Sequence, residues 1–90
     1  MTKVEVEVFS TDTNASVVRL PERQFPGIVI QGDSLKIMLD TARDISRLSK
    51  ESGVPELVDS VAELEEMLGG YLRAYEISLR KHNVSLPYAE

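Results

Sequence analysis

The segment RLPERQFPGIVIQGDSL, residues 19–35, places two prolines and two glycines around one short apolar run. Pro21 and Pro26 restrict φ to the turn and extended range, whereas Gly27 and Gly32 permit backbone conformations that other residues avoid. This pattern predicts a turn, a buried strand over about 27–31, a tight turn and the start of a helix.

Two further strands are expected before this segment. Val4, Val6 and Val8 alternate with acidic residues, and a period of two is typical of a half-buried strand, here over about 3–9. Residues 10–14 are polar and suit a hairpin turn, and the β-branched stretch that follows favours a return strand over about 15–20. Because the connections are short, we expect the three strands to pair in chain order as an antiparallel meander.

The second half of the chain begins with a predicted helix over about 34–52. Asp33 or Ser34 can cap its first turn, and Gly53 is a natural stop. Opposite to its charged side, apolar residues recur at helical spacing. This predicted buried stripe comprises Leu35, Met38, Leu39, Ala42, Ile45 and Leu48.

A second helix is predicted over about 55–82, with Pro55 in its first turn. Its apolar residues keep one phase through Gly69 and Gly70, which predicts an unbroken helix. Two interior glycines cost roughly 1 kcal/mol each relative to alanine, so we expect another backbone to lie close to them. The predicted stripe comprises Leu57, Val61, Leu64, Leu68, Tyr71, Tyr75 and Leu79.

These elements predict an α+β fold in a single domain, 1–90: a three-stranded antiparallel meander packed on one face by a two-helix antiparallel hairpin. One apolar stripe per helix matches one covered sheet face. A chain of 90 residues can bury one small core. The expected core residues are Val4, Val6, Val8, Val18, Leu20, Ile28, Ile30, Leu39, Ile45, Leu64 and Leu68.

Charge and hydropathy limit the classes of partner. The net charge of −5 argues against nucleic acid, whose binding requires a basic face. No apolar run approaches the ~20 residues that span a bilayer, and the first residues contain no apolar signal-peptide core. We therefore expect a cytoplasmic protein without a membrane partner, and the composition leaves room for a homodimer.

The residues available for chemistry argue against an enzyme. The chain has no cysteine, and its single histidine, His82, excludes a His-based metal cluster. No Gly-x-Ser-x-Gly elbow occurs, and the paired carboxylates, such as Glu65 and Glu66, fall on predicted exposed faces, whereas catalytic carboxylates need burial or a close charged partner. We expect no catalytic residue, no metal and no cofactor.

Six acidic residues and no basic residue lie between positions 51 and 66. Some of these charges complement the dipole of the second helix's N-terminus, and a solvated acidic face accounts for the rest without a function. The functional interpretation is a docking surface for a basic protein partner. The candidate partner-binding residues are Glu51, Glu56, Asp59, Glu63 and Glu66.

A second hypothesis concerns the strand-to-helix turn over 31–36. Free N–H groups and the helix dipole favour an anion at such a position. Asp33 would repel an anion, however, and an ordinary helix cap explains this turn without a ligand. The candidate anion-binding residues are Arg19, Arg23, Gly32, Ser34 and Lys36.

The runs NASVVRLP (14–21) and RQFPGIVIQGDSL (23–35) resemble an uncharacterised family of short bacterial proteins, as do the spaced residues of the tail YE…L…HNV…LPY within 75–88. The match covers nearly the whole chain. The resemblance implies a stand-alone bacterial domain and carries no assigned activity.

Two functions follow as hypotheses. The first is a non-catalytic, small acidic interaction protein, such as an immunity protein that neutralises a bacterial toxin; its size, acidity and lack of catalytic residues fit. The alternative is a small anion- or ligand-binding module that uses the turn over 31–36.

Overall fold

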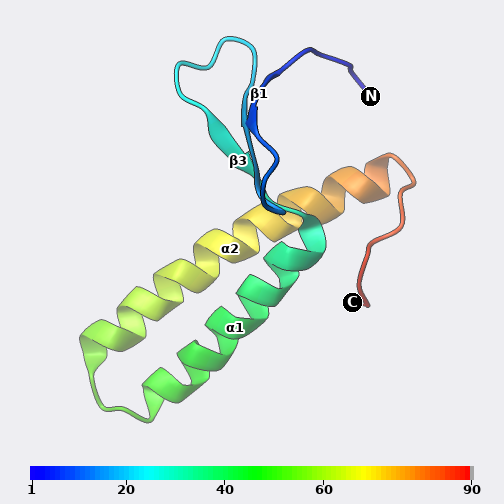
Figure 1. Ribbon diagram of the computed structural model, residues 1–90. Helices are drawn as coiled ribbons and strands as arrows, with labels where there is room; N and C mark the ends of the chain where they lie inside the picture. The colour runs from blue at the N-terminus through cyan, green and yellow to red at the C-terminus, as the bar shows by residue number, and fades with distance from the viewer. Residues whose placement is uncertain (90) are drawn as a thin grey trace. The chain divides into compact units, whose positions relative to one another are not determined.

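The computed structural model describes residues 1–89, and the chain divides into two units, Met1–Gln31 and the part that begins at Gly32. The two units are described separately. The element order is that of an α+β fold, as predicted (Figure 1). The elements are β1 (Glu7–Ser10), β2 (Ser16–Arg19), β3 (Gly27–Val29), α1 (Gly32–Lys50) and α2 (Pro55–Lys81).

The N-terminal unit is a three-stranded antiparallel sheet with the order β1-β2-β3, which confirms the predicted meander. Val8 lies opposite Val18, but Ser10 lies opposite Val17, so the register shifts by one residue at Phe9. Such a bulge bends and twists a strand. All three strands are shorter than predicted, and the valines at 4 and 6 precede β1.

The turn after β2 forms where the prolines predict it. The N–H of Arg23 donates to the carbonyl oxygen of Leu20 at 3.2 Å, and Glu22 has a φ of 65°. With Pro21 in the first central position, these features are typical of a type II turn. Glycine usually occupies the place that Glu22 takes, because φ is positive there.

Most residues of this unit that were predicted to be buried in the core are exposed. Val18 is half-buried on the central strand. A sheet of three short strands has no second layer of its own, and the N-terminal unit leaves the other side chains open. The predicted core residues that are exposed in this unit are Val4, Val6, Val8, Leu20, Ile28 and Ile30.

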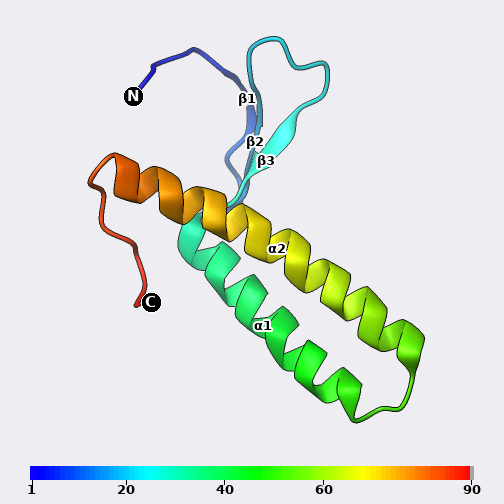
Figure 2. The same cartoon turned by 180° about the vertical axis from the view of Figure 1, so that it is seen from behind.

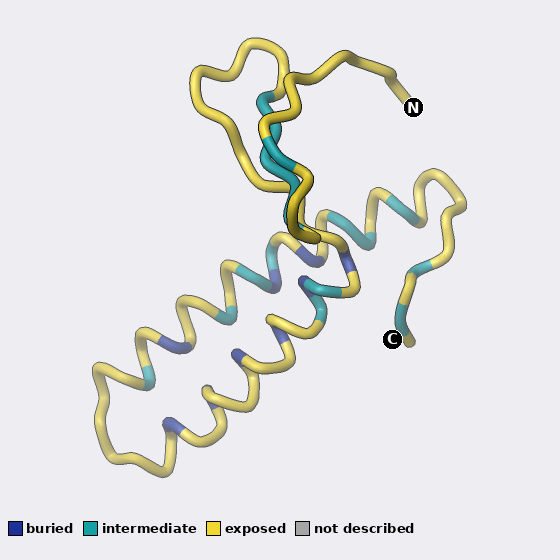
Figure 3. The backbone as a smooth tube through the Cα atoms, in the orientation of Figure 1, coloured by how far each residue is buried: buried dark blue, intermediate teal, exposed yellow. Residues whose placement is uncertain are grey.

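The C-terminal unit is a hairpin of α1 and α2, which lie side by side and run antiparallel (Figure 2). Its buried centre consists of Leu35, Leu39 and Leu72. The dark blue segments of Figure 3 follow the sides on which the two helices face each other. Three half-buried side chains pack against this centre: Leu68, Tyr75 and Tyr88.

The two helices meet along a regular seam, which we call the inner seam. Its residues recur at alternating intervals of three and four, the 3.5-residue period of coiled-coil packing. On α1 it consists of Gly32, Leu35, Leu39, Ala42, Ser46 and Ser49, all buried. On α2 it consists of Val58, Val61, Glu65, Leu68, Leu72, Tyr75 and Leu79, all buried or half-buried.

The predicted apolar stripes only partly coincide with this seam. Ile45 and Leu64, predicted as core, are 43% and 45% exposed. The apolar residues of each helix occupy two neighbouring rows, and only one row faces the other helix; small serines complete it near the loop. The other stripe residues that are exposed are Met38, Leu48, Leu57 and Tyr71.

The helix ends follow the predicted signals with small shifts. α1 begins at Gly32, two residues before the predicted start, and Asp33 accepts a hydrogen bond from the Ser34 N–H at 2.9 Å. Gly53 has a φ of +72° in the loop, and Pro55 opens α2. Gly53 and Pro55 therefore act as the predicted stop and start, whereas Asp33 and Ser34 lie inside α1 and do not cap it as predicted.

The far end of α2 closes on a left-handed residue. Asn83 has a φ of 57°, and the Val84 N–H donates to the carbonyl oxygen of Leu79 at 2.9 Å. A left-handed residue followed by this long-range bond is typical of a Schellman ending.

The two interior glycines lie within α2, which confirms the unbroken helix. The predicted close approach of another backbone is wrong. A Cβ at Gly69 or Gly70 would meet only the guanidinium of Arg73, at 3.6 and 3.9 Å. The glycine that a neighbour does require is Gly32, because a Cβ there would collide with the ring of Tyr75.

Candidate functional site

Four acidic side chains form a row along the outer side of α2, on successive turns. We call Glu56, Asp59, Glu63 and Glu66 the acidic row; all four are exposed. Their intervals of three, four and three keep them on one broad side of the helix. Glu51, the fifth candidate, is exposed in the turn between the helices.

The acidic row has no cationic partner among the residues that the structure describes. Within residues 1–89, neither its four carboxylates nor that of Glu51 takes part in an ion pair. Two acids of α1 differ from the row in this respect. Asp40 lies 2.6 Å from Nζ of Lys36, and Asp44 lies 3.5 Å from a guanidinium nitrogen of Arg47. The negative field of the hairpin is therefore concentrated along α2.

Glu65 belongs to the acidic run of the sequence but not to the row. It lies in the inner seam, and its carboxylate is 3.9 Å from Nε of Arg43 on α1. Only the tertiary structure separates this paired acid from its neighbour Glu66.

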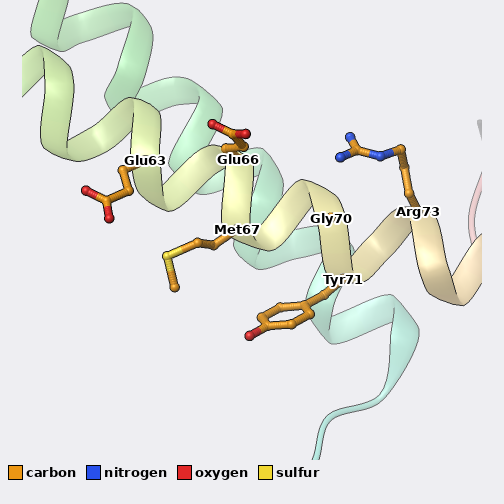
Figure 4. A pocket seen from close by; sticks show the side chains of 6 residues that line it. All are labelled: Glu63, Glu66, Met67, Gly70, Tyr71 and Arg73. Atoms are coloured by element: carbon orange, nitrogen blue, oxygen red, sulfur yellow. The ribbon is translucent and has the colours of Figure 1, made fainter.

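A shallow, open depression adjoins the row at Gly70 (Figure 4). The glycine has no side chain to fill the space between its longer neighbours. Figure 4 shows the side chains of Met67 and Tyr71 on one side of α2 and those of Glu66 and Arg73 on the other. Sequence reasoning missed this feature, although a glycine among long side chains on an exposed helix face was the signal that could have indicated it.

Two cations of the candidate anion site, Arg19 and Lys36, already pair with carboxylates of the chain. Both Nε and Nη2 of Arg19 donate to the carboxylate of Glu7 at 2.9 Å, and Arg19 lies 5.4 Å from the ring centroid of Phe9. Lys36 pairs with Asp40. Both cations would have to leave a carboxylate to meet an external anion.

The rest of that set is divided between the two units. Arg23 belongs to the sheet unit, is exposed, and has no ion pair among the described residues. Gly32 and Ser34 belong to the first turn of α1, where the ring of Tyr75 occupies the space beside Gly32. Binding of an anion by these residues stays a prediction.

The segment after α2 is fastened to the hairpin through Tyr88. Its hydroxyl donates to Oε2 of Glu76 at 2.8 Å, and Nζ of Lys36 lies 6.0 Å from its ring centroid. Burial, together with the hydrogen bond to Glu76, raises the pKa of Tyr88 to about 12. Leu86 and Tyr88 are both half-buried.

Residues 1–89 contain neither a cluster of metal ligands nor a helix that could cross a membrane. No group of three or more His, Asp or Glu side chains there is arranged to hold a metal ion. Neither α1 nor α2 combines the length and the apolar character that crossing a membrane demands.

Comparison with known proteins places the chain in a family. Residues 1–88 match a family of unknown function (DUF6959), and the chain belongs to this family. No curated protein and no solved structure matches the chain.

Proposed function

We propose that this family member is a non-catalytic interaction protein that binds a basic protein partner through its acidic row. One observation carries the proposal: the four carboxylates of the row are exposed and form no ion pair with any of residues 1–89, whereas Asp40 and Asp44 on α1 are paired with cations of their own helix. The chain thus has cations on the same hairpin, but they do not neutralise the row.

The row carries an energetic cost that a partner would remove. Like charges three or four residues apart destabilise a helix by roughly 0.2–0.5 kcal/mol per pair. Lysine or arginine side chains of a partner would relieve this repulsion in the complex. Because the row is exposed, it is expected to act mainly on the association rate, by steering the partner before contact.

More specifically, we propose that the partner is a bacterial toxin. The chain would act as an immunity protein that neutralises this toxin in the cytoplasm. A protein that inhibits its target by binding alone needs a folded surface with charge of one sign, and it needs no catalytic group. The 90-residue length and the net charge of −5 suit that role. An acidic row would repel the phosphates of nucleic acid, which favours a protein partner.

The non-catalytic part of the proposal is supported by the position of the only histidine. His82 is the C-cap residue of α2 and is exposed. A serine or carboxylate nucleophile would need a positioned base within hydrogen-bond reach. No side-chain hydrogen bond that the structure records over residues 1–89 joins His82 to a serine or a carboxylate.

The test uses the intact chain as bait in the native host's lysate. The row variant carries Glu56→Lys, Asp59→Lys and Glu63→Lys. The matched control carries Asp12→Lys, Asp40→Lys and Asp44→Lys, so both baits have the same net charge. We expect the wild-type chain and the control to retain one basic protein in equimolar amount, and the row variant to lose it.

Two results would contradict the proposal. Equal retention by all three baits would show that the row takes no part in binding. Loss from both variants would show a dependence on net charge alone.

A further inference from the structure

A second row of uncharged side chains runs along the hairpin beside the inner seam. We call it the outer seam. Its intervals again alternate between three and four, the period of helix-to-helix packing. On α1 it consists of Ser34, Met38, Thr41, Ile45 and Leu48, and on α2 of Leu57, Ser60, Leu64, Met67, Tyr71, Ala74 and Ser78.

The two halves of the outer seam share one face of the hairpin. On both helices, outer-seam residues directly precede inner-seam residues, as Met38 precedes Leu39 and Leu64 precedes Glu65. An antiparallel pair is related by an approximate two-fold axis normal to its face, so equivalent positions lie on the same face. The apolar rows of α1 and α2 therefore form one continuous surface.

The opposite face of the hairpin is already occupied. Lys36 and Glu76 follow inner-seam residues, and Tyr88 contacts both of them. The segment after α2 thus lies on the charged side and leaves the outer seam uncovered within the C-terminal unit.

Charge separates the two faces sharply. None of the twelve outer-seam residues carries a charge, although 28% of the chain's residues do. Seven large apolar side chains on this face are between 42% and 63% exposed. They are Met38, Ile45, Leu48, Leu57, Leu64, Met67 and Tyr71.

We propose that the outer seam binds a second copy of this chain, so that two hairpins form a four-helix bundle with two-fold symmetry. The seam's period selects a helical partner, because knobs-into-holes packing requires the same 3.5-residue repeat on both sides. A second copy supplies a hairpin with that repeat and with the same charge-free face. Two chains of net charge −5 repel each other, and this contact keeps their charged side chains apart.

The available area fits a dimer. Seven half-exposed side chains of this size present on the order of 600 Å² of surface. The small residues between them bring the face close to the roughly 800 Å² that each partner contributes to a standard interface. The acidic row lies outside the outer seam, so both copies would keep it exposed.

The experiment is sedimentation equilibrium of the intact chain from micromolar to millimolar concentration. We expect the wild-type mass to approach twice the 10.0 kDa of one chain. Ile45→Lys with Leu64→Lys should weaken association at least about 100-fold, since buried apolar anchors dominate interface energetics. The matched control, Ile37→Lys with Ile77→Lys, changes two exposed isoleucines outside the seam and should leave the dimer intact.

Circular dichroism checks that each variant keeps its helices, and Leu64→Gln replaces the double variant if that one unfolds. A wild-type chain that stays at 10.0 kDa at every concentration would overturn the proposal. The outer seam would then be covered by another protein or by another part of its own chain. A dimer that both double variants weaken equally, or that neither weakens, would also overturn it. Dissociation by the row variant but not by the seam variant would assign the interface to the acidic row instead.

Discussion

The hydroxyl of Tyr88 donates a hydrogen bond of 2.8 Å to Oε2 of Glu76, twelve residues earlier in the chain. This bond ties the segment after α2 back to the last turns of α2. The ring of Tyr88 also packs against the buried cluster of Leu35, Leu39 and Leu72. The C-terminal segment is therefore part of the hairpin's packing.

Tyr88→Phe should lower the free energy of unfolding by about 1 kcal/mol, because it removes one hydrogen bond to a charged acceptor and keeps the ring. Urea denaturation monitored by circular dichroism measures the change. Tyr71→Phe is the control, since Tyr71 is 63% exposed and should tolerate loss of its hydroxyl. Equal effects of the two substitutions would contradict the role of the bond to Glu76.

Alkaline pH should weaken the fold through the same residue. The pKa of Tyr88 is raised from 10.0 to about 12, so the unfolded chain loses this proton at lower pH than the folded chain does. Its contribution is complete below pH 10 and is lost as the pH rises from about 10 to about 12. Unfolding free energies at several pH values should fall less steeply for Tyr88→Phe than for the wild type. Identical slopes would refute this assignment.

Two glycine substitutions should act in opposite directions. Gly32→Ala should destabilise the chain by roughly 1–3 kcal/mol, because the new methyl group meets the ring of Tyr75. Gly70→Ala should stabilise it by up to about 1 kcal/mol, since only the guanidinium of Arg73 lies within contact distance. Thermal unfolding of both variants compares the signs directly, and a stabilising Gly32→Ala would show that the ring moves aside freely.

A fourth stability prediction concerns the serines of the inner seam. Ser49 is 2% exposed, and its hydroxyl donates to the carbonyl oxygen of Ser46 at 2.7 Å. Ser49→Leu should cost about 1–3 kcal/mol by overpacking the interface between the helices. Lys50→Leu, at the neighbouring exposed position, should have little effect. Chemical denaturation that ranks the two variants in the reverse order would contradict the assignment of the seam.

The sequence predicted the elements because their signals are local. Gly53 and Pro55 mark the loop between the helices, and the phase of apolar residues shows that α2 continues through its glycines. It failed to distinguish the inner from the outer seam, because both rows contain apolar residues at helical spacing. The sequence also failed to indicate that Ser46 and Ser49 are buried. A search for apolar residues at helical spacing passes over small polar residues that pack between two helices.

The sequence also failed to predict where the strands pair. Val4, Val6 and Val8 alternate as a half-buried strand does, yet pairing begins at Glu7 and the register shifts at Phe9. A bulge depends on cross-strand pairing, which alternation alone does not specify.

The acidic row could be predicted as a set, because intervals of three and four place side chains on one side of a helix. The absence of ion pairs between the row and any of residues 1–89 could not be predicted. That property depends on Arg43 reaching Glu65 across the hairpin and on Asp40 and Asp44 engaging the cations of α1.

The most direct test of the proposed function is the association rate of the captured basic protein with the purified chain, measured by stopped flow at several salt concentrations. The proposal predicts a rate that falls steeply with salt, since exposed charges are screened beyond about 8 Å at physiological ionic strength. The variant with Glu56→Lys, Asp59→Lys and Glu63→Lys should associate slowly, whereas the control with Asp12→Lys, Asp40→Lys and Asp44→Lys should keep most of the wild-type rate. An association rate that neither salt nor the row variant changes would contradict a partner-binding role for the acidic row.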